Sequence, residues 1–356
     1  MAYLVDVDSY NNTDATSKSF GKRLYLDSNG TLYCVFRNLN DELEIKKSYD
    51  GGQSWYPVAS RSLSDVYVER RDLLCIGKRN DKICVVLGNY WRIHYEYGNY
   101  NVYIKCFYED GSNENVWLGC VYEAHPDAEG FCIFNDGKIG LCIYREAGTA
   151  HGATCVIHED GCTPDIGASG TDYNSVLHSY DEDLCLYSAE DHTDGSNLVR
   201  LAFYQKEVNQ QQAIDFGSRY DRIQSWFKIV KISNNLSYFI AHEKDQDDDK
   251  YKVNLYKFEF DSATLTKIAT VVDTTNVGEQ PILGGHYDIA KDGYGNVYIM
   301  YVKYPPNDYL FLRKFDTFTE TLEDEQQLTD FKVRTPQMVS SLPNSKYIYY
   351  TYTRKS

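Results

Sequence analysis

The sequence is poor in methionine and proline and has no long apolar run. It holds 3 Met and 8 Pro in 356 residues, against 33 Tyr and 15 Phe. No window is long and apolar enough to cross a bilayer, and MAYLVDVDSYNNTD at the N-terminus lacks a basic leader followed by an apolar stretch. The sequence therefore predicts no membrane insertion and no signal peptide, and it favours synthesis in a cytoplasm.

The sequence also lacks any cluster of lysine and arginine. With 36 basic and 52 acidic residues, its formal net charge is −16. Phosphate backbones are bound by basic faces, so this charge argues against a nucleic-acid partner. The remaining composition, 42% hydrophobic and 15% aromatic, is typical of a globular chain rich in strand-forming residues rather than of a disordered one.

Metal-binding and redox motifs are absent as well. All ten cysteines lie between Cys34 and Cys185, with neither a CxxC motif nor a Cys/His spacing typical of zinc. Most lie within apolar, strand-like runs, where a reduced thiol packs as a small apolar group. The run Asp245 to Asp249 lacks the ligand spacing of a calcium loop and is interpreted as a solvated segment. We expect no metal and no cofactor.

One short apolar motif recurs along the whole chain. The segments TLYCVFRN, KICVVLGN, IGLCIYRE, DLCLYSAE, LSYFIAHE, VYIMYVK and YIYYTYTR can be aligned on one central column. Its members are 43 to 60 residues apart, and they are Cys34, Cys84, Cys142, Cys185, Phe239, Ile299 and Tyr349. Each segment is apolar on both faces, which is typical of the buried second strand of an up-and-down sheet.

A second column supports the same period. An aspartate ends the next strand of five units, and these residues are Asp50, Asp110, Asp160, Asp261 and Asp316. A further strand follows most of these turns, which gives four strands per unit. The pattern predicts an all-β fold, a β-propeller of seven blades with four antiparallel strands each. Two packed β-sandwiches are the alternative, but they would not require one repeat along the whole chain.

The last repeat of the sequence indicates how the ring closes. The segment from Gln337 to Arg354 holds only two strands, so we expect residues 1–8 to supply an outer strand to this last blade and to hide both edges. Residues 9–19 would then form a connector and residues 20–356 the blades. The whole chain, residues 1–356, is accordingly predicted to be a single domain.

The stretch SYDGGQSW combines Ser48, Asp50, Gly52, Ser54 and Trp55 in the pattern S-x-D-x-G-x-[S/T]-W. It resembles the Asp-box (BNR) repeat of the sialidase-like β-propellers. The resemblance implies a turn between the third and fourth strands of a blade, with a structural role, on the face opposite the active site. The local chemistry agrees, because Asp and Ser side chains accept backbone hydrogen bonds and glycines supply positive φ.

In a propeller the ligand face is formed by the loops from second to third strands and by the connections between blades. Charged residues at the ends of equivalent strands are the catalytic candidates: Arg37, Arg145, Glu146, Glu190 and Glu243. The sialidase resemblance implies three arginines, a tyrosine nucleophile with a glutamate, and an acid/base aspartate. However, the N-terminal Arg-Ile-Pro motif is missing and no arginine triad aligns. A sialidase-like glycoside hydrolase, with two carboxylates, therefore stays an alternative.

The loop GNYWRIHYEYGNYN, from Gly88 to Asn101, has the composition of a binding surface. Tyrosine and tryptophan offer rigid contact area with a polar tip, and Asn and Gly let the backbone adapt, which suits sugars or protein surfaces. The ligand-binding candidates are Tyr90, Trp91, Arg92, His94, Tyr95, Tyr97 and Tyr100. The other interpretation is an extended hairpin whose alternate tyrosines cover a neighbouring blade.

Taken together, these features favour a non-enzymatic recognition protein that binds a cell-surface glycan or protein. The absence of an export signal and the tyrosine-rich loop suit a receptor-binding or tail structural component of a bacteriophage or tail-like particle, assembled in a host cytoplasm. Its partners would be the receptor and other particle subunits. The alternatives are the glycoside hydrolase and a purely structural subunit of a larger particle.

The cysteine pattern generates a first testable prediction. Cys34, Cys84, Cys142 and Cys185 occupy equivalent strands of different blades, which are spaced too widely for routine bridging. Titration of the denatured, unreduced protein with a thiol reagent is expected to find nearly all ten thiols free. Two or more disulfides would contradict this expectation and the cytoplasmic assignment.

Overall fold

Antiparallel strands supply the regular structure of the chain. A computed structural model describes residues 22–38, 40, 42–62, 74–87, 93–96, 99–122, 130–147, 150–162, 166–168, 178–191, 198–218, 227–244, 251–273, 286–303 and 308–354. In these ranges there is no helix, and hence none that is long and apolar enough to cross a membrane. The strands group into two units: Met1–Asn89, Lys105–Glu114 and Ile282–Ser356 form unit 1, and Tyr90–Ile104 and Asn115–Pro281 form unit 2.

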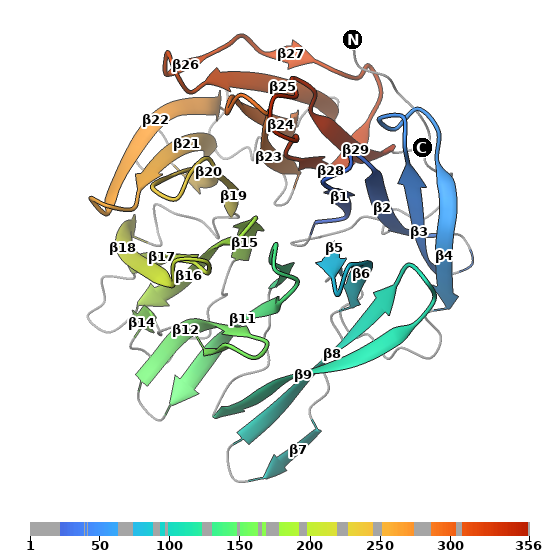
Figure 1. Cartoon of the computed structure of the whole chain (residues 1–356). Helices are drawn as coiled ribbons and strands as arrows, with labels where there is room; N and C mark the ends of the chain where they lie inside the picture. The colour runs from blue at the N-terminus through green and yellow to red at the C-terminus, as the bar shows by residue number, and fades with distance from the viewer. Residues whose placement is uncertain are drawn as a thin grey trace. The chain divides into compact units, whose positions relative to one another are not determined.

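Three sheets lie entirely within unit 1 (Figure 1). Sheet 1 consists of β1 (Leu24–Leu26), β2 (Leu32–Arg37), β3 (Glu42–Ser48) and β4 (Tyr56–Ser62). Sheet 6 consists of β23 (Tyr287–Lys291), β24 (Val297–Lys303), β25 (Tyr309–Asp316), β26 (Thr321–Leu322) and β27 (Gln326–Gln327). Sheet 7 consists of β28 (Val333–Val339) and β29 (Tyr349–Arg354).

Three further sheets lie entirely within unit 2. Sheet 3 consists of β10 (Gly130–Ile133), β11 (Ile139–Ala147), β12 (Ala150–Ile157), β13 (Gly161–Cys162) and β14 (Ile166–Ala168). Sheet 4 consists of β15 (His178–Asp181), β16 (Leu184–Asp191), β17 (Leu198–Gln205) and β18 (Gln210–Ser218). Sheet 5 consists of β19 (Phe227–Lys231), β20 (Leu236–Lys244), β21 (Tyr251–Glu259) and β22 (Thr264–Asp273).

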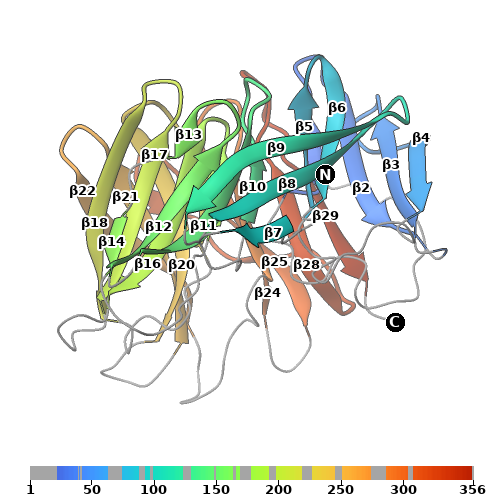
Figure 2. The same cartoon turned by 90° about the horizontal axis from the view of Figure 1, so that it is seen from below.

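Sheet 2 has strands in both units. It consists of β5 (Leu74–Arg79), β6 (Lys82–Leu87), β7 (Ile93–Glu96), β8 (Asn99–Tyr108) and β9 (Asn113–Tyr122). The ten-residue strands β8 and β9 form a long hairpin (Figure 2). The strand β7 comes from the tyrosine-rich segment and pairs with the beginning of β8, Ile93 opposite Asn101 and Glu96 opposite Asn99.

The predicted repeat matches the sheets closely. All seven column residues, from Cys34 to Tyr349, lie in the second strand of a sheet, and all five column aspartates lie at the turn after a third strand. Sheets 1, 3, 4, 5 and 6 each join four consecutive strands in chain order, as predicted for a blade. In sheets 3 and 6 a further short strand, β14 or β27, also pairs with the third strand.

Two sheets depart from the regular four-strand pattern, so the prediction of seven four-stranded blades is correct for five sheets only. In sheet 2 the extra strand β7 interrupts the chain order, because the segment between β6 and β8 is long enough to fold back on β8 as a hairpin. Sheet 7 has two described strands. Residues 1–8, the predicted closing strand, and residues 9–19, the predicted connector, lie outside the described residues.

The second strands are buried on both faces because alternate residues pack against two neighbouring sheets. In β2, Tyr33 and Val35 join a core with Ile76, Ile83 and Phe107 of sheet 2. The residues between and beside them point the other way, because side chains alternate along a strand. Thus Leu32, Cys34 and Phe36 pack with Val339 and Tyr349 of sheet 7. The seven cysteines whose side chains are described are buried thiols outside disulfides: Cys34, Cys75, Cys84, Cys106, Cys132, Cys155 and Cys185.

Aromatic rings fill the core between sheets 4 and 5. Phe203 stacks on Phe258 with ring centroids 3.8 Å apart, and Phe239 stacks on Tyr256 at 5.1 Å. Phe216 contacts Tyr256 edge-on at 5.2 Å. Full burial of such a side chain contributes about 1.5–3 kcal/mol, and each aromatic pair adds about 0.5–1.5 kcal/mol. These contacts make the interface between the two sheets the most aromatic part of the described core.

Polar side chains join the first strands of neighbouring sheets. Ser179 and Asp181 of β15 accept hydrogen bonds from the backbone N–H groups of Ile229 (2.9 Å) and Lys231 (3.0 Å) in β19. In unit 1, Asp288 of β23 accepts a hydrogen bond from Met338 N–H in β28 at 2.6 Å. Gln337 of β28 likewise accepts one from Arg23 N–H at 2.7 Å. Backbone donors of β19 and β28, and that of Arg23 beside β1, are therefore satisfied by side chains of a neighbouring sheet.

Removing one of these acceptors tests their contribution. Asp181 is 4% exposed, so Asp181→Ala leaves the buried N–H of Lys231 without this acceptor, at a cost of about 1–3 kcal/mol. Asp181→Asn keeps a carbonyl oxygen there and is expected to lose less. Urea unfolding monitored by fluorescence measures both, with exposed Asp324→Ala as a control expected to change stability by less than about 0.5 kcal/mol. Equal stability of the Asp181→Ala variant and the wild type would contradict this role.

Candidate functional site

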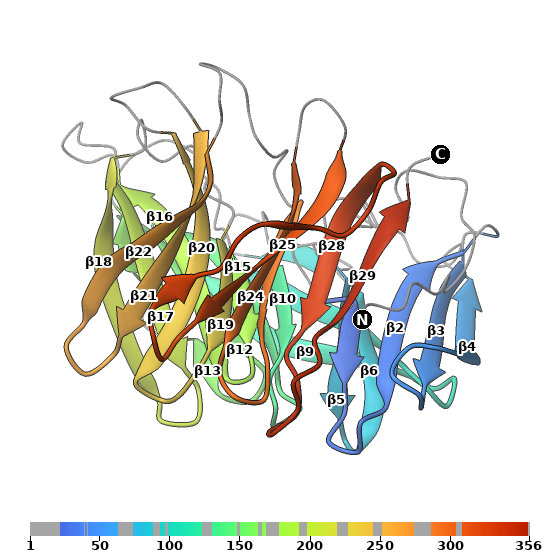
Figure 3. The ribbon, with the colours of Figure 1, turned by 90° about the horizontal axis from the view of Figure 1, so that it is seen from above.

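The two ends of each sheet differ in chemistry. At one end, here called the turn end, short turns join the first strand to the second and the third to the fourth. At the other, the loop end, lie the connections from second to third strands and from one sheet to the next. Figure 3 shows the turns that join β1 to β2 and β28 to β29 pointing downward. Among the connections between sheets, that between β4 and β5 has 11 residues and that between β22 and β23 has 13.

The turn between β3 and β4 is closed by its own side chains. The Asp50 carboxylate accepts hydrogen bonds from Ser48 Oγ (2.8 Å) and from the N–H groups of Gln53 and Ser54 (both 2.9 Å). It also accepts one from Ser54 Oγ. These bonds lower the pKa of Asp50 to about 2, and the bond from the Ser54 hydroxyl has the largest effect. The carboxylate is therefore occupied by the turn itself, as a structural role requires.

The rest of this turn is equally closed. The Gly52 N–H donates to Ser48 Oγ at 2.8 Å, and the Trp55 indole N–H donates to the Gly52 carbonyl at 3.1 Å. Gly51 and Gly52 have φ of 72° and 91°, a region that glycine adopts without the strain a side chain would add. Trp55 packs with the core between sheets 1 and 7. Its indole thus contributes to packing between sheets.

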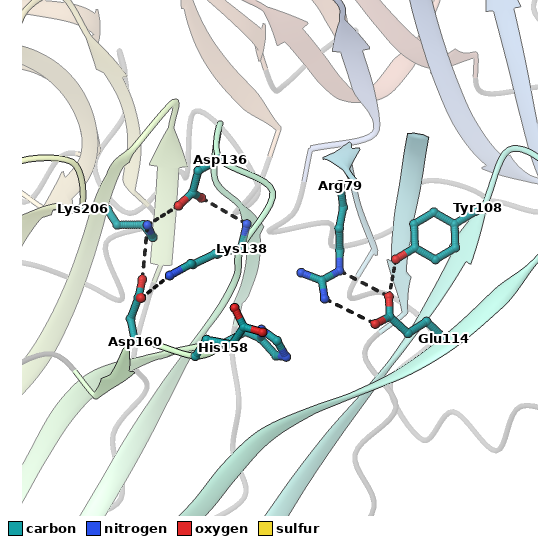
Figure 4. A network of polar contacts seen from close by, with 9 residues as sticks. Arg79, Tyr108, Glu114, Asp136, Lys138, His158, Asp160 and Lys206 are labelled. Atoms are coloured by element: carbon teal, nitrogen blue, oxygen red, sulfur yellow. Dashed lines mark hydrogen bonds and ion pairs between the residues drawn. The ribbon is translucent and has the colours of Figure 1, made fainter. Parts of the chain in front are cut away.

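Charged side chains at the turn end of unit 2 are paired with one another. Figure 4 shows Lys206 of sheet 4 between Asp136 and Asp160 of sheet 3, with Lys138 on Asp160. Burial opposes ionisation of Asp160, but the hydrogen bonds from Lys138 and Lys206 outweigh it and lower its pKa. The network ties two sheets together at their turns.

A separate group lies at the turn end of sheet 2, in unit 1. Arg79 is 9% exposed, and its guanidinium lies 3.4 Å from both carboxylate oxygens of Glu114. Tyr108 donates its hydroxyl proton to the same carboxylate (Figure 4). Burial, followed by this hydrogen bond, raises the pKa of Tyr108. Like the unit 2 network, these charges are used within the protein.

The predicted catalytic residues lie at the loop end. Arg37 ends β2, Arg145 and Glu146 lie near the end of β11, and Glu190 near the end of β16. Glu243 lies near the end of β20. The three glutamates thus occupy equivalent positions in three sheets of unit 2. The side chain of Glu243 is described, and those of the other four residues lie outside the described set.

Glu243 is held in a buried polar cluster. Its exposed fraction is 7%, and its carboxylate accepts hydrogen bonds from Tyr256 Oη (2.5 Å) and Asn254 Nδ2 (2.6 Å) of the adjacent strand. Asn254 in turn accepts one from Thr270 Oγ1 at 2.9 Å. Both Glu243 oxygens are therefore engaged within sheet 5. This cluster stabilises the loop end of the sheet, and its accessory residues were not predicted because nothing in the repeat marks Asn254 or Thr270.

His242, next to Glu243, is buried and neutral. It is 4% exposed, and its ring lies 5.5 Å from that of Tyr251, centroid to centroid. Its Nε2 atom is buried and makes no hydrogen bond to the described residues. Burial lowers the pKa of His242 to about 4. The imidazole therefore carries no charge at neutral pH.

The predicted ligand loop is described only in part. His94 and Tyr95 lie in β7 and Tyr100 in β8, which places this part of the backbone in a hairpin. Tyr90, Trp91, Arg92 and Tyr97 lie outside the described residues, as does the run Asp245 to Asp249. Among the residues that the structure describes, no three His, Cys, Asp or Glu side chains are grouped as a metal site.

Comparisons with known proteins identify the fold. No family model and no curated protein matches the chain. Among solved structures, a polysaccharide lyase PL25 (ulvan lyase) bound to -[GlcA(1-4)Rha3S]- has a TM-score of 0.56, at 7% identity over 96% of this chain and 94% of the lyase. A Mycobacterium tuberculosis puromycin-hydrolyzing peptidase has a TM-score of 0.50, at 12% identity over 94% of this chain. This chain spans about half, 51%, of the peptidase.

A weaker match, with a TM-score of 0.46, is the Aleuria aurantia lectin, a six-bladed β-propeller, at 8% identity over 85% of this chain and 93% of the lectin. At these identities the likeness shows the fold alone, an all-β chain with a propeller arrangement. This agrees with the fold class predicted from the repeat.

The buried imidazole makes stability depend on pH. Because the pKa of His242 is about 4 in the folded chain and about 6.5 when unfolded, the unfolded state binds more protons between these values. The stability that the neutral His242 gives to the folded chain is complete above pH 6.5 and is lost as the pH falls toward 4. Between pH 7.5 and 4.5, this group lowers the free energy of unfolding by roughly 2–3 kcal/mol. Urea unfolding at the two pH values is expected to show that His242→Leu loses correspondingly less stability than the wild type. Equal losses would contradict the assignment.

Proposed function

We propose that this chain is a non-enzymatic recognition protein that binds a glycan through its loop ends. The observation that carries the proposal is the contrast between the two ends. At the turn ends, the carboxylates of Asp50, Asp160 and Glu114 are engaged in turns and ion pairs. Groups already satisfied within the protein leave little to hold a polar ligand. The long connections lie at the opposite ends, which is where loops on a rigid scaffold usually carry function.

The tyrosine-rich segment supplies the chemistry for a sugar. Aromatic faces offer apolar area to the C–H face of a pyranose ring, while phenol, indole and amide groups reach its hydroxyls. The ulvan lyase, a protein of similar fold, is bound to -[GlcA(1-4)Rha3S]-. A bound saccharide in that protein supports, by analogy, a saccharide as the ligand of this chain.

Glycoside hydrolysis is the second candidate. Glu146, Glu190 and Glu243 have equivalent places at strand ends of unit 2, and a glycosidase needs two carboxylates at a defined separation. Against it, Glu243 is 7% exposed and bonded through both oxygens to Tyr256 and Asn254. A carboxylate held in this way supports the strand end and is a poor acid or nucleophile. Binding without cleavage is therefore the preferred function.

The finer assignments are part of the same proposal. The seven sheets would be the blades of one ring, closed by residues 1–8 beside sheet 7, and SYDGGQSW would be an Asp-box of the sialidase-like kind. A place in a phage or tail-like particle, with synthesis in a host cytoplasm, would make the glycan a cell-surface receptor. The identity of the neighbouring genes tests this context directly.

The test of function compares binding with cleavage. Trp91→Ala combined with Tyr95→Ala is expected to weaken binding to a printed microarray of purified saccharides at least about thirtyfold, the loss typical of a central aromatic anchor. Val208→Ala, at an exposed turn-end position of sheet 4, is the matched control and should bind normally. Circular dichroism and urea unfolding confirm that each variant is folded.

The cleavage arm uses the same saccharides. The wild type is expected to release no reducing sugar, and Glu146→Gln, Glu190→Gln and Glu243→Gln are expected to leave binding unchanged. If the wild type releases sugar and one of these variants does not, the function would be hydrolysis and not recognition. Unchanged binding by the aromatic double variant would place the ligand site elsewhere on the chain.

A further inference from the structure

A single Asn-Gly dipeptide lies at the turn end of sheet 1. It is Asn29-Gly30, in the turn from β1 to β2, which Figure 3 shows pointing downward. The chain also has six Asp-Gly dipeptides, which begin at Asp50, Asp110, Asp136, Asp160, Asp194 and Asp292. Five of these lie in described turns, and Asp194 lies outside the described residues. The turn of β1 and β2 thus has a side-chain amide before its glycine where the others have a carboxylate.

The described Asp-Gly carboxylates are engaged within the protein. Asp50 is the clearest case, because it accepts hydrogen bonds from the Ser48 and Ser54 side chains and from backbone N–H groups of its own turn. The other four accept hydrogen bonds from lysine side chains or backbone N–H groups, and they are Asp110, Asp136, Asp160 and Asp292. An ionised carboxylate is a poor electrophile, because attack on its carbon adds charge to a group that is already negative. We therefore expect these five dipeptides to be chemically stable.

The Asn29 side chain is a neutral amide and differs from these carboxylates. It is exposed, and it makes no hydrogen bond to the described residues. The backbone N–H of Asn29 is bonded to Asp27 Oδ1 at 2.9 Å. The carbonyl carbon of an amide accepts a nucleophile more readily than that of a carboxylate, and the amide nitrogen can leave as ammonia. Asn29 therefore combines a reactive carbon with access to water.

The neighbouring glycine supplies the nucleophile. Gly30 has φ of 85°, and a Cβ atom built there would meet no atom within 4 Å, so its surroundings are open. In the closed turn the Gly30 N–H donates to the Asp27 carbonyl at 3.0 Å. The Asp27 carboxylate also holds the turn, because it accepts the N–H groups of Asn29 and of Thr31 (2.8 Å). The Gly30 nitrogen can therefore attack when the turn opens, and Asp27 controls how often it opens.

The hairpin that carries this turn is short. The strand β1 has three residues, and its register with β2 holds three residue pairs. Local openings are most frequent in exposed segments with few buried apolar contacts, and the tip of a short hairpin is such a segment. The turn can thus open while the core of sheet 1 stays folded.

We propose that Asn29 is a site of spontaneous deamidation in the folded chain. The Gly30 backbone nitrogen gives up its proton to water or hydroxide and bonds to the side-chain carbonyl carbon of Asn29. The bond from that carbon to the side-chain nitrogen breaks, and the nitrogen takes up a proton from solvent and leaves as ammonia, so that a cyclic imide remains. One water molecule then opens the imide. Opening at the side-chain carbon gives aspartate, and opening at the main-chain carbon gives isoaspartate.

The modification changes both charge and backbone. Either product adds a negative charge beside Asp27, and isoaspartate also carries the main chain through its side-chain carbon, which lengthens the turn. Leu24 in β1 and Leu32 in β2 pack in the core shared with sheet 7, so a distorted turn loosens that contact. The deamidated chain is expected to unfold at a lower urea concentration than the freshly purified chain. This inference does not depend on the proposed recognition function.

Peptide mapping by mass spectrometry of the full chain, incubated in mildly alkaline buffer, tests the proposal. Asn29 is expected to become a mixture of aspartate and isoaspartate before conversion is detected at Asn344, an exposed asparagine followed by serine. The serine side chain hinders attack by its own nitrogen, so Asn344 is the control within the same chain. An unchanged Asn29, or earlier conversion of Asn344, overturns the proposal. Aspartate without isoaspartate overturns attack by Gly30, because direct hydrolysis by water gives aspartate alone.

Three variants test the role of the turn. Asn29→Gln has one more methylene, which slows ring closure, and it is expected to show no conversion at this position in the same period. Asp27→Ala removes the acceptor of two N–H groups, and it is expected to speed conversion at least about fivefold, because lost hydrogen bonds increase the open population. Exposed Asp324→Ala is the control and should convert at the wild-type rate. Equal rates for Asp27→Ala and the wild type overturn control by this turn, and circular dichroism shows that each variant is folded.

Discussion

Hydrogen bonds from side chains of one sheet to the backbone of the next are the interaction on which the rest of this structure depends. A first strand pairs with its second strand along one edge, and its other edge is buried against a neighbouring sheet. Ser179, Asp181, Asp288 and Gln337 satisfy the buried N–H groups of that edge. A buried donor without a partner costs about 1–3 kcal/mol, so each of these residues constrains the position of its neighbour.

These bonds also determine the direction of neighbouring sheets. Ser179 pairs with Ile229 and Asp181 with Lys231, two residues further along in each strand. The first strands of sheets 4 and 5 therefore run in the same direction, and their turn ends coincide. Within each unit, the turn ends can stabilise the fold while the loop ends remain available for recognition. The turns are closed by their own aspartates and ion pairs, and the loops can vary without disturbing them.

The repeat could be predicted because a strand that is buried on both faces leaves a simple apolar pattern in the sequence. Residues of β2 alternate between the core shared with sheet 2 and the core shared with sheet 7. The segment is apolar on both faces for that reason, and its copies could be aligned. The aspartates after third strands could be predicted for a similar local reason, since an Asp side chain closes the turn that it begins.

The surroundings of the candidate site could not be predicted in the same way. Glu243 was identified by its place at a strand end, but its partners Asn254 and Tyr256 lie on another strand, in register beside Ala241 and Phe239. The register shifts next to both partners are not visible in a hydrophobic pattern. The same is true of β7, which forms by pairing within one long segment. The exposure of aromatic side chains at the turns of unit 1, such as Tyr294 and Phe318, could not be predicted either, because these residues share no motif.

The central claim is that the loop ends bind the ligand and the turn ends do not. Hydrogen exchange measured by mass spectrometry, with and without a saccharide identified on the microarray, tests it along the whole chain in one experiment. The account predicts slower exchange of the segment from Gly88 to Asn101 when the saccharide is bound, and unchanged exchange in the turn that contains Asp50. Protection of that turn, with unchanged exchange from Gly88 to Asn101, would contradict it.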